Sequence, residues 1–202
     1  MKHFNKEKVD VRGSLSHGSG CLIDINVIIE GKVLIGDNVR IGSNCIIKDT
    51  MIGNNTIIKP FTYIEESQIN EHCNIGPYAN LRKGSKIDSG SSIGNFVEIK
   101  DSQIGQNCKV NHLSFIGDST LEDNVIIGAS TITCNHDGKE FKKIIIRKNS
   151  YIGSGTKLIA PIEVGENATI GSGSVITKNV AANKLTLSRV KQVVVNNWVR
   201  RK

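Results

Sequence analysis

Residues 91–128 read SSIGNFVEIKDSQIGQNCKVNHLSFIGDSTLEDNVIIG, and this stretch decides the fold. An aliphatic residue recurs in it at a step of six, shortened to five at two places: Ile93, Ile99, Ile104, Val110, Ile116, Leu121 and Ile127. A period of six fits neither the 3.6-residue repeat of an amphipathic helix nor the simple alternation of a long strand.

The same period extends in both directions. It runs from Ile23 to Ile87 before the quoted stretch and, after an interruption, from Ile152 to Ile176. Three short strands at this spacing make one triangular coil of about 18 residues, in which each side turns one aliphatic side chain inward. Stacked coils suit the stiff, β-branched side chains of Ile and Val. The period therefore predicts an all-β fold, a parallel β-helix of hexapeptide repeats, and repeats of this class are left-handed.

The composition agrees with this prediction. Aromatic residues make up only 4% of the 202 residues, so the core cannot be built from large rings, and 20 Gly accompany 3 Pro. The glycine content excludes collagen, and the composition fits poorly with a helical bundle rich in Leu and Ala. No apolar run approaches the roughly 18 residues of a membrane span, and the polar start has no apolar signal segment.

The five cysteines lie far apart, their number is odd and no CxxC occurs among them. This usage is typical of reduced, packed thiols, and we expect a cytoplasmic protein without contact to a membrane. The cysteines are Cys21, Cys45, Cys73, Cys108 and Cys134.

The pattern divides the chain into a lead-in at 1–20, the β-helix at 21–178 and a basic arm at 179–202 that abandons the period. An interruption at about 133–149, TCNHDGKEFKKIIIRKN, predicts a loop that leaves one corner of the coils. Its basic cluster has two readings, a solvated loop or a loop that reaches over a neighbouring chain to complete a site. The arm, with Trp198, either packs on a neighbour or frays.

The net charge of +7 is compatible with nucleic acid, acidic lipid or anionic small molecules and chooses none of them. Arg82 and Lys100 are 18 residues apart, which places them one coil apart on the same side. Two stacked cations are unfavourable unless an anion such as a phosphate joins them or each has its own carboxylate. His112 lies in the densest polar stretch of the coils, where a histidine is either structural or catalytic.

Several segments resemble, in order, the acetyltransferase half of the bacterial bifunctional N-acetylglucosamine-1-phosphate uridyltransferase / glucosamine-1-phosphate acetyltransferase. The segments that carry the resemblance are IGPYANLRKGSKI, GNFVEIKDSQIG, NHLSFIGD, DNVIIGASTITCNHDG, YIGSGTKLIAPIEVG, ATIGSGSVIT and LTLSRVKQ. The resemblance covers nearly the whole chain. Nothing in the sequence resembles the Gly-rich nucleotide-binding start of the uridyltransferase half.

The resemblance implies an acetyl-CoA-dependent enzyme that converts glucosamine 1-phosphate to N-acetylglucosamine 1-phosphate, a step toward the cell-wall precursor UDP-N-acetylglucosamine. It implies a homotrimer with sites between subunits and no metal. By position, His112 matches the catalytic base, and an imidazole exchanges a proton near neutral pH. The positions that match the sugar-phosphate site are Arg82, Lys100 and Phe115, and those that match the acetyl-CoA site are Ala129, Asn135, His136, Ser154, Ser172 and Arg189.

The chain departs from the family pattern at several of these positions. Phe115 stands where the family has tyrosine, and Ile126 where it has asparagine, so two polar contacts to the substrate are missing. His136 replaces a tyrosine, and Glu140 stands where a functional lysine is usual, with Lys139, Lys142 or Lys143 as substitutes. Ser130 replaces a glycine and Ser172 an alanine.

We therefore predict the same reaction, with two alternatives left open. One is an acyltransferase of this fold with another amine or hydroxyl acceptor, and the other is a decayed, non-catalytic trimeric homologue. A zinc hydratase is disfavoured because His72, His112 and His136 lack a repeat spacing that would bring three ligands together. Nucleic-acid binding is disfavoured because no basic patch carries interleaved aromatic residues.

Overall fold

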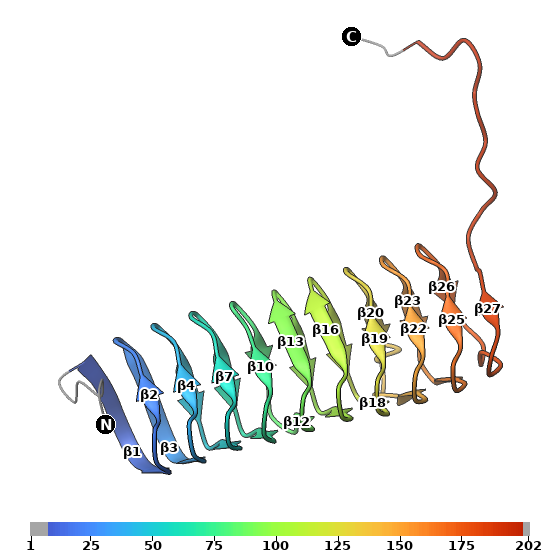
Figure 1. The fold of residues 1–202 in the computed structure, drawn as a ribbon. Coiled ribbons are helices and arrows are strands. Elements are labelled where there is room, and N and C mark those ends of the chain that lie inside the picture. The colour runs from blue at the N-terminus through green and yellow to red at the C-terminus, as the bar shows by residue number, and fades with distance from the viewer. Residues whose placement is uncertain (1–7, 200–202) are drawn as a thin grey trace.

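In the computed structural model, which describes residues 8–199, the chain forms a solenoid of stacked coils with a triangular section (Figure 1). The strands pair in parallel, and residues 8–199 contain no α-helix. The prediction of a left-handed parallel β-helix of hexapeptide repeats is confirmed. No helix in this range is long and apolar enough to cross a membrane.

One side of the triangle, here called the first face, is a ten-stranded sheet. Its strands are β2 (Leu22–Ile23), β4 (Arg40–Ile41), β7 (Ile57–Ile58), β10 (Asn74–Ile75), β13 (Ser92–Asn95), β16 (Lys109–His112), β19 (Ile126–Ile127), β22 (Tyr151–Ile152), β25 (Thr169–Ile170) and β27 (Leu185–Thr186).

The other two sides belong to one seventeen-stranded sheet, which β1 (Val9–His17) and β3 (Val27–Ile35) join at its start. The second face continues with β5 (Ile46–Lys48), β8 (Tyr63–Glu65), β11 (Asn80–Leu81), β14 (Glu98–Lys100), β17 (Phe115–Gly117), β20 (Ile132–Cys134), β23 (Lys157–Ile159) and β26 (Val175–Ile176). The third face continues with β6 (Met51–Ile52), β9 (Gln68–Ile69), β12 (Lys86–Ile87), β15 (Gln103–Ile104), β18 (Ser119–Leu121), β21 (Ile144–Ile146) and β24 (Ile162–Val164).

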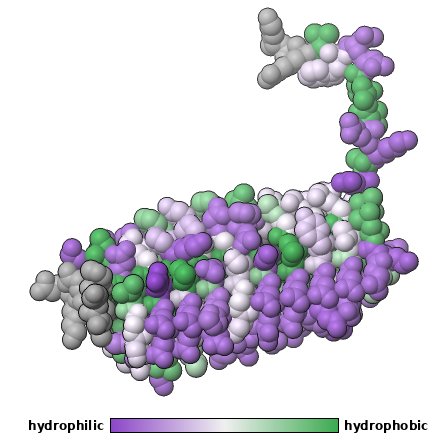
Figure 2. All heavy atoms as spheres, in the orientation of Figure 1, coloured by the Kyte–Doolittle hydropathy of each residue, from purple (hydrophilic) through white to green (hydrophobic). Residues whose placement is uncertain are grey.

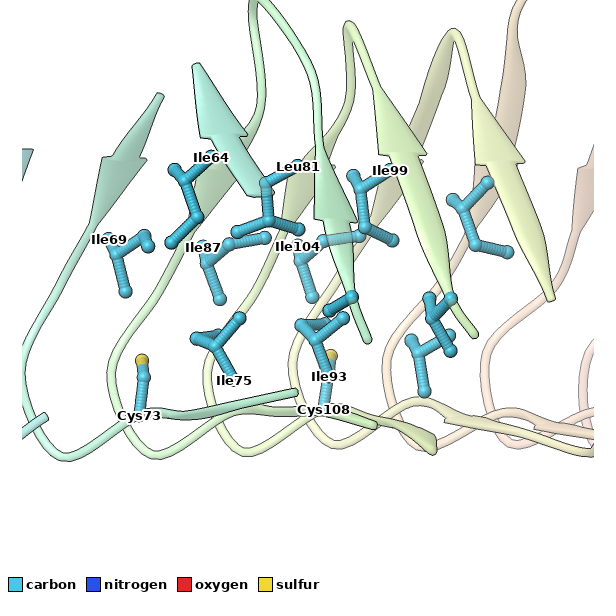
Figure 3. Packing of buried hydrophobic residues seen from close by; sticks show 14 of the residues in the cluster. Ile64, Ile69, Cys73, Ile75, Leu81, Ile87, Ile93, Ile99, Ile104 and Cys108 are labelled. Atoms are coloured by element: carbon cyan, nitrogen blue, oxygen red, sulfur yellow. The ribbon is translucent and has the colours of Figure 1, made fainter. Parts of the chain in front are cut away.

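The aliphatic period of the sequence forms the core of the solenoid. Ile93 pairs with Val110, and Val110 pairs with Ile127, so that the three side chains lie one above another and are almost fully buried. Ladders of this kind run along all three faces (Figure 3). Burying a branched aliphatic side chain contributes about 1.5–3 kcal/mol, so the ladders supply the main driving force for folding.

Asparagine ladders stabilise the turns between the third and first faces. The Asn124 side chain donates to Asn149 Oδ1 at 3.2 Å, and Asn149 donates in turn to Asn167 at 3.1 Å. These asparagines have φ near +55° to +60°, a left-handed conformation that Asn tolerates better than most residues. Figure 2 shows hydrophilic side chains lined up along the lower edge of the solenoid.

The five cysteine thiols are free, and four of them are buried. Burial raises the pKa of Cys45, Cys73 and Cys108 to about 11, because the apolar interior disfavours the thiolate. The prediction of packed, unpaired thiols is confirmed.

The elements sharpen the predicted boundaries. Strand β1 already pairs with β3 inside the stretch assigned to the lead-in, and β27 adds a pairing inside the stretch assigned to the arm. Residues 135–143 lie between β20 and β21, and Ile144 and Ile146 of β21 are buried in the core. Beyond Arg189 the arm leaves the solenoid (Figure 1). Its side chains are exposed, Trp198 among them. The terminal cations Arg200, Arg201 and Lys202 lie outside the described residues.

Candidate active site

One edge of the solenoid, where the first face turns into the second, collects five of the residues on which the site depends. Each follows the buried aliphatic residue of its first-face strand by two positions. We call this column the histidine edge: Asn95, His112, Ala129, Ser154 and Ser172.

Backbone hydrogen bonds connect one coil to the next along the histidine edge. Ser130 N donates to His112 O at 3.2 Å, Gly155 N to Ala129 O at 2.7 Å and Gly173 N to Ser154 O at 2.8 Å. Arg189 closes the column, because its Nη1 donates to Ser172 O at 2.7 Å. The geometry of this edge therefore follows directly from the stacking of the coils.

Glycine is required for the close approach of these coils. A Cβ built on Gly128 would lie 2.5 Å from Ser154 N, and one on Gly153 would clash in the same way with Ser172. The neighbouring atoms belong to the backbone and cannot move aside, so a larger residue would separate the coils.

His112 is exposed at the end of β16, and its ring is oriented by a neighbour one coil earlier. Its Nδ1 lies 2.9 Å from Asn95 Oδ1, and the two residues are in register. Since a carboxamide oxygen only accepts hydrogen bonds, this contact favours the neutral tautomer with its proton on Nδ1 and its lone pair on Nε2. This is the tautomer that a general base needs.

The second edge, where the second face turns into the third, carries the predicted phosphate ligands Arg82 and Lys100. We call it the cation edge, and Asp118 and Asn135 also belong to it. Arg82 N donates to Ile99 O at 2.9 Å, which places Arg82 beside Lys100 on the next coil, as the spacing predicted.

Each of the two stacked cations has a carboxylate partner. Arg82 Nη1 lies 2.8 Å from Glu98 Oε1, and Lys100 Nζ lies 3.7 Å from Asp118 Oδ2. Of the two explanations given for this pair, a bound anion or a carboxylate for each cation, the second therefore applies. The stacked cations by themselves do not require a bound anion. The role of these cations as phosphate ligands rests on the resemblance.

Asp118 joins two residues that the resemblance assigns to different ligands. The Asn135 side-chain amide donates to Asp118 Oδ2, the same oxygen that faces Lys100 Nζ. Asn135 is buried, with 7% of its surface exposed. Sequence reasoning missed Asp118, although it follows Gly117, which pairs with Lys100 on the next coil, and this was a usable signal.

Phe115 lies on the second face, with its ring turned toward the cation edge. A Cβ on Gly117 would lie 2.7 Å from Phe115 Cζ and 2.6 Å from Asn135 Nδ2, so the glycine makes room for both side chains. Ile126 lies on the first face and is 38% exposed. The two apolar departures therefore face away from each other within one chain.

The inserted loop at 135–143 folds as a small hairpin. His136 and Phe141 form an antiparallel bridge, and Lys142 N donates to Asn135 O at 2.7 Å. Gly138, at φ +95°, makes the reversal possible. The hairpin places the Phe141 ring centroid 3.8 Å from Lys100 Nζ.

Lys142 uses its charge inside the hairpin. Its Nζ lies 2.8 Å from Asp137 Oδ2 and 3.3 Å from Glu140 Oε1. The hydrogen bond from Lys142 holds the pKa of Asp137 well below its usual range. Of the three lysines weighed as substitutes at Glu140, Lys143 lines a polar cavity of about 210 Å³ together with Asp118.

The predicted site residues thus fall into two groups. His112, Ala129, Ser154, Ser172 and Arg189 lie along the histidine edge. The others lie at or near the cation edge: Arg82, Lys100 and Asn135 at the edge itself, Phe115 on the adjoining second face and His136 in the hairpin. Within residues 8–199, no group of three or more His, Cys, Asp or Glu side chains could hold a metal ion.

Two family models match parts of the chain. Residues 11–85 match the C-terminal domain of GMPPB, and residues 143–178 match the bacterial transferase hexapeptide model of six repeats. Curated relatives cover almost all of the chain. The bifunctional protein GlmU of Baumannia cicadellinicola subsp. Homalodisca coagulata is 49% identical over 195 residues, which are 96% of this chain and 42% of the relative.

The chain is a homologue of the acetyltransferase half of GlmU. GlmU of Saccharophagus degradans is also 49% identical, over 193 residues, and GlmU of Janthinobacterium is 46% identical over the same length. The chain spans less than half the length of these GlmU relatives. The family resemblance predicted from the sequence is confirmed.

Solved structures confirm the fold. LpxA of Bacteroides fragilis, a UDP-N-acetylglucosamine acyltransferase, is 21% identical with a TM-score of 0.55, over 88% of this chain and 68% of that one. The UDP-N-acetylglucosamine acyltransferase of Francisella novicida is 16% identical with a TM-score of 0.52, over 89% and 65%. At these identities the likeness concerns the β-helix alone.

Proposed function

We propose that the chain transfers the acetyl group of acetyl-CoA to the amine of glucosamine 1-phosphate. The observation that carries the proposal is His112 on the histidine edge, held by Asn95 in the tautomer with a free Nε2. The homology to the acetyltransferase half of GlmU supports the choice of reaction.

In this proposal Nε2 of His112 takes a proton from the sugar amine as the nitrogen attacks the thioester carbon. The tetrahedral intermediate then collapses, the C–S bond breaks and the amide forms. The proton on Nε2 passes to the departing CoA thiolate, which leaves as the free thiol. General acid–base catalysis of this kind typically contributes about 10²- to 10⁴-fold to the rate.

The two edges have different ligands. The pantetheine arm of acetyl-CoA runs along the histidine edge, past Ala129, Ser154 and Ser172, toward Arg189. Polar backbone groups at this edge, which the coil-to-coil hydrogen bonds hold in place, suit an extended amide-containing chain. Asn135 and His136 complete the acetyl-CoA site from the base of the hairpin.

The sugar phosphate lies at the cation edge. A phosphate there has Arg82 and Lys100 as ligands, in competition with Glu98 and Asp118. Phe115 cannot donate the hydrogen bond of the family's tyrosine, and loss of one hydrogen bond to a charged group costs roughly 1.5–3 kcal/mol. We expect weaker binding of the acceptor than in proteins that have the tyrosine.

The active assembly in this proposal is a cytoplasmic homotrimer with sites between subunits. His112 lies at one edge of the second face and the phosphate ligands Arg82 and Lys100 at the other, so a site that uses both edges takes them from two subunits. The exposed apolar side chains of the arm, Val193 and Trp198 among them, have a neighbouring subunit as their natural cover.

The test is a thiol-release assay with acetyl-CoA and glucosamine 1-phosphate. We expect His112→Ala to lower kcat/KM by about 10²- to 10⁴-fold and to leave thermal unfolding unchanged, since the side chain is exposed. His72→Asn, at a turn with φ +59°, is the matched control and should keep wild-type activity. CoA release that does not depend on His112 would refute the proposal.

A second candidate is acyl transfer to a different acceptor, and the apolar residues Phe115 and Ile126 favour it. An acceptor panel of amino sugars with and without the phosphate separates the two. Higher kcat/KM for an uncharged amine would select the second candidate. Thermal stabilisation by CoA without turnover of any acceptor would identify a non-catalytic homologue instead.

A further inference from the structure

The ammonium group of Lys100 lies between two side chains from different parts of the chain. Asp118 Oδ2 is 3.7 Å from Nζ, and the centroid of the Phe141 ring is 3.8 Å from it. Only 26% of the Lys100 side chain is exposed. A lysine otherwise keeps four rotatable bonds, so these contacts restrict a flexible cation to one place.

The hairpin holds the Phe141 ring in this position. The His136 ring lies 4.7 Å from the Phe141 ring, and the antiparallel bridge joins the two residues through the backbone. The ion pair between Asp137 and Lys142 joins the two arms of the hairpin. Phe141 is nevertheless 57% exposed, so it contributes little to the core, and its main partners are His136 and Lys100.

We propose that Phe141 is a positioning residue, which holds the ammonium of Lys100 at the cation edge in the place where the acceptor phosphate binds. The electron-rich face of an aromatic ring attracts a cation, and this attraction grows as water is excluded. The ring covers one side of Nζ without neutralising its charge, whereas a second carboxylate would neutralise it. The ring therefore keeps the Lys100 ammonium in place for an anionic ligand.

This role gives the inserted hairpin a function within its own chain. Its lysines need not touch the phosphate, because Lys142 is engaged by Asp137 and Glu140. The hairpin acts through its one aromatic residue, which the sequence places next to Glu140, where the family has a lysine.

The inference rests on the proposed function, so its test has one arm that measures turnover and one that does not. In the turnover arm, Phe141→Leu should raise KM for glucosamine 1-phosphate by about two- to five-fold, the equivalent of one exposed cation–π contact. KM for acetyl-CoA and kcat should stay near their wild-type values. Phe141→Tyr keeps the ring and should restore the wild-type KM.

The second arm uses NMR of the protein with ¹³C-methylated lysines and needs no activity. A methyl signal of Lys100, identified by its loss in Lys100→Arg, should be shifted upfield by the ring current of Phe141. The shift should disappear in Phe141→Leu and persist in Phe141→Tyr. Phe61→Leu is the control, because Phe61 is similarly exposed at 49% and stacks on Tyr78, at a centroid distance of 5.1 Å.

The kinetic and NMR measurements distinguish failure of the inference from failure of the proposed function. An upfield Lys100 signal in a protein without glucosamine 1-phosphate acetylation would refute the proposed function and leave the contact standing. A Lys100 signal unaffected by Phe141→Leu would overturn the inference. So would a wild-type KM in Phe141→Leu, or a KM in Phe141→Tyr that stays as high as in Phe141→Leu.

Discussion

The two edges of the second face are built in different ways. Backbone hydrogen bonds attach the coils to one another at both edges, such as Gly155 N to Ala129 O at the histidine edge and Arg82 N to Ile99 O at the cation edge. At the cation edge, the functional groups are held by side chains: Glu98 on Arg82, Asp118 on Lys100, and Phe141 over Lys100.

The difference shows what a repeat can position and what it cannot. The stacking of similar coils fixes the positions of backbone atoms, because hydrogen bonds join each coil to the next. Such fixed positions suit a base and an extended cofactor chain. A cation on a long side chain has no such restraint, because its rotamers are independent of the backbone register. The cation edge therefore needs residues outside the repeat, and the hairpin supplies one of them.

Among the residues that hold the functional groups in place, the largest effect is expected at Asn95 on the histidine edge. Asn95→Leu removes the acceptor for His112 Nδ1, so the ring can rotate and take the other tautomer. We expect kcat to fall by about ten-fold, the equivalent of one hydrogen bond of roughly 1.4 kcal/mol, with little change in either KM. Steady-state kinetics measure this, with Asn74→Leu on the first face as control. An unchanged kcat would contradict the role of Asn95.

A smaller effect is expected at the cation edge, and it should reach both substrates. Asp118→Asn removes the charge opposite Lys100 and weakens the acceptor of the Asn135 amide. We expect KM for glucosamine 1-phosphate and for acetyl-CoA each to rise by about five-fold, the loss of roughly 1 kcal/mol per ligand.

Asp101→Asn is the matched control for Asp118, because it changes the equivalent turn residue one coil earlier, with φ +44° against +49°. It should leave both KM values near wild type. A change in only one KM of Asp118→Asn would show that Asp118 does not link the two ligand sites.

The smallest effect concerns the hairpin and its pH dependence. The hydrogen bond from Lys142 lowers the pKa of Asp137. The ion pair therefore stabilises the hairpin fully above the ordinary carboxyl pKa, near 4, and this stabilisation is lost as the pH falls through the lowered pKa. We expect the upfield Lys100 methyl signal to persist at pH 4 in the wild type. In Asp137→Asn the signal should be partly relaxed already at pH 7. An identical pH response of the two proteins would exclude a role for this ion pair.

The resemblance to the family named the candidate site residues, and the period of the sequence explains why several of them align along one edge. His112, Ala129, Ser154 and Ser172 share one position of the repeat, and the spacing of 18 residues placed Arg82 beside Lys100. The sequence did not predict that Asn95, Asp118 and Phe141 contact other residues of the candidate site. Each acts by the direction of its side chain across coils or out of the hairpin, and the hydrophobic pattern carries no information about that direction.

The amino-acid sequence by itself determined the solenoid, its register and the column that carries His112, because one buried aliphatic residue in each short strand permits a single way of stacking the coils. Only the tertiary structure decided how the charges at the cation edge are paired and where the hairpin lies. Those contacts join residues such as Lys100 and Phe141, far apart in the sequence, and their choice depends on competing polar partners of similar strength rather than on burial.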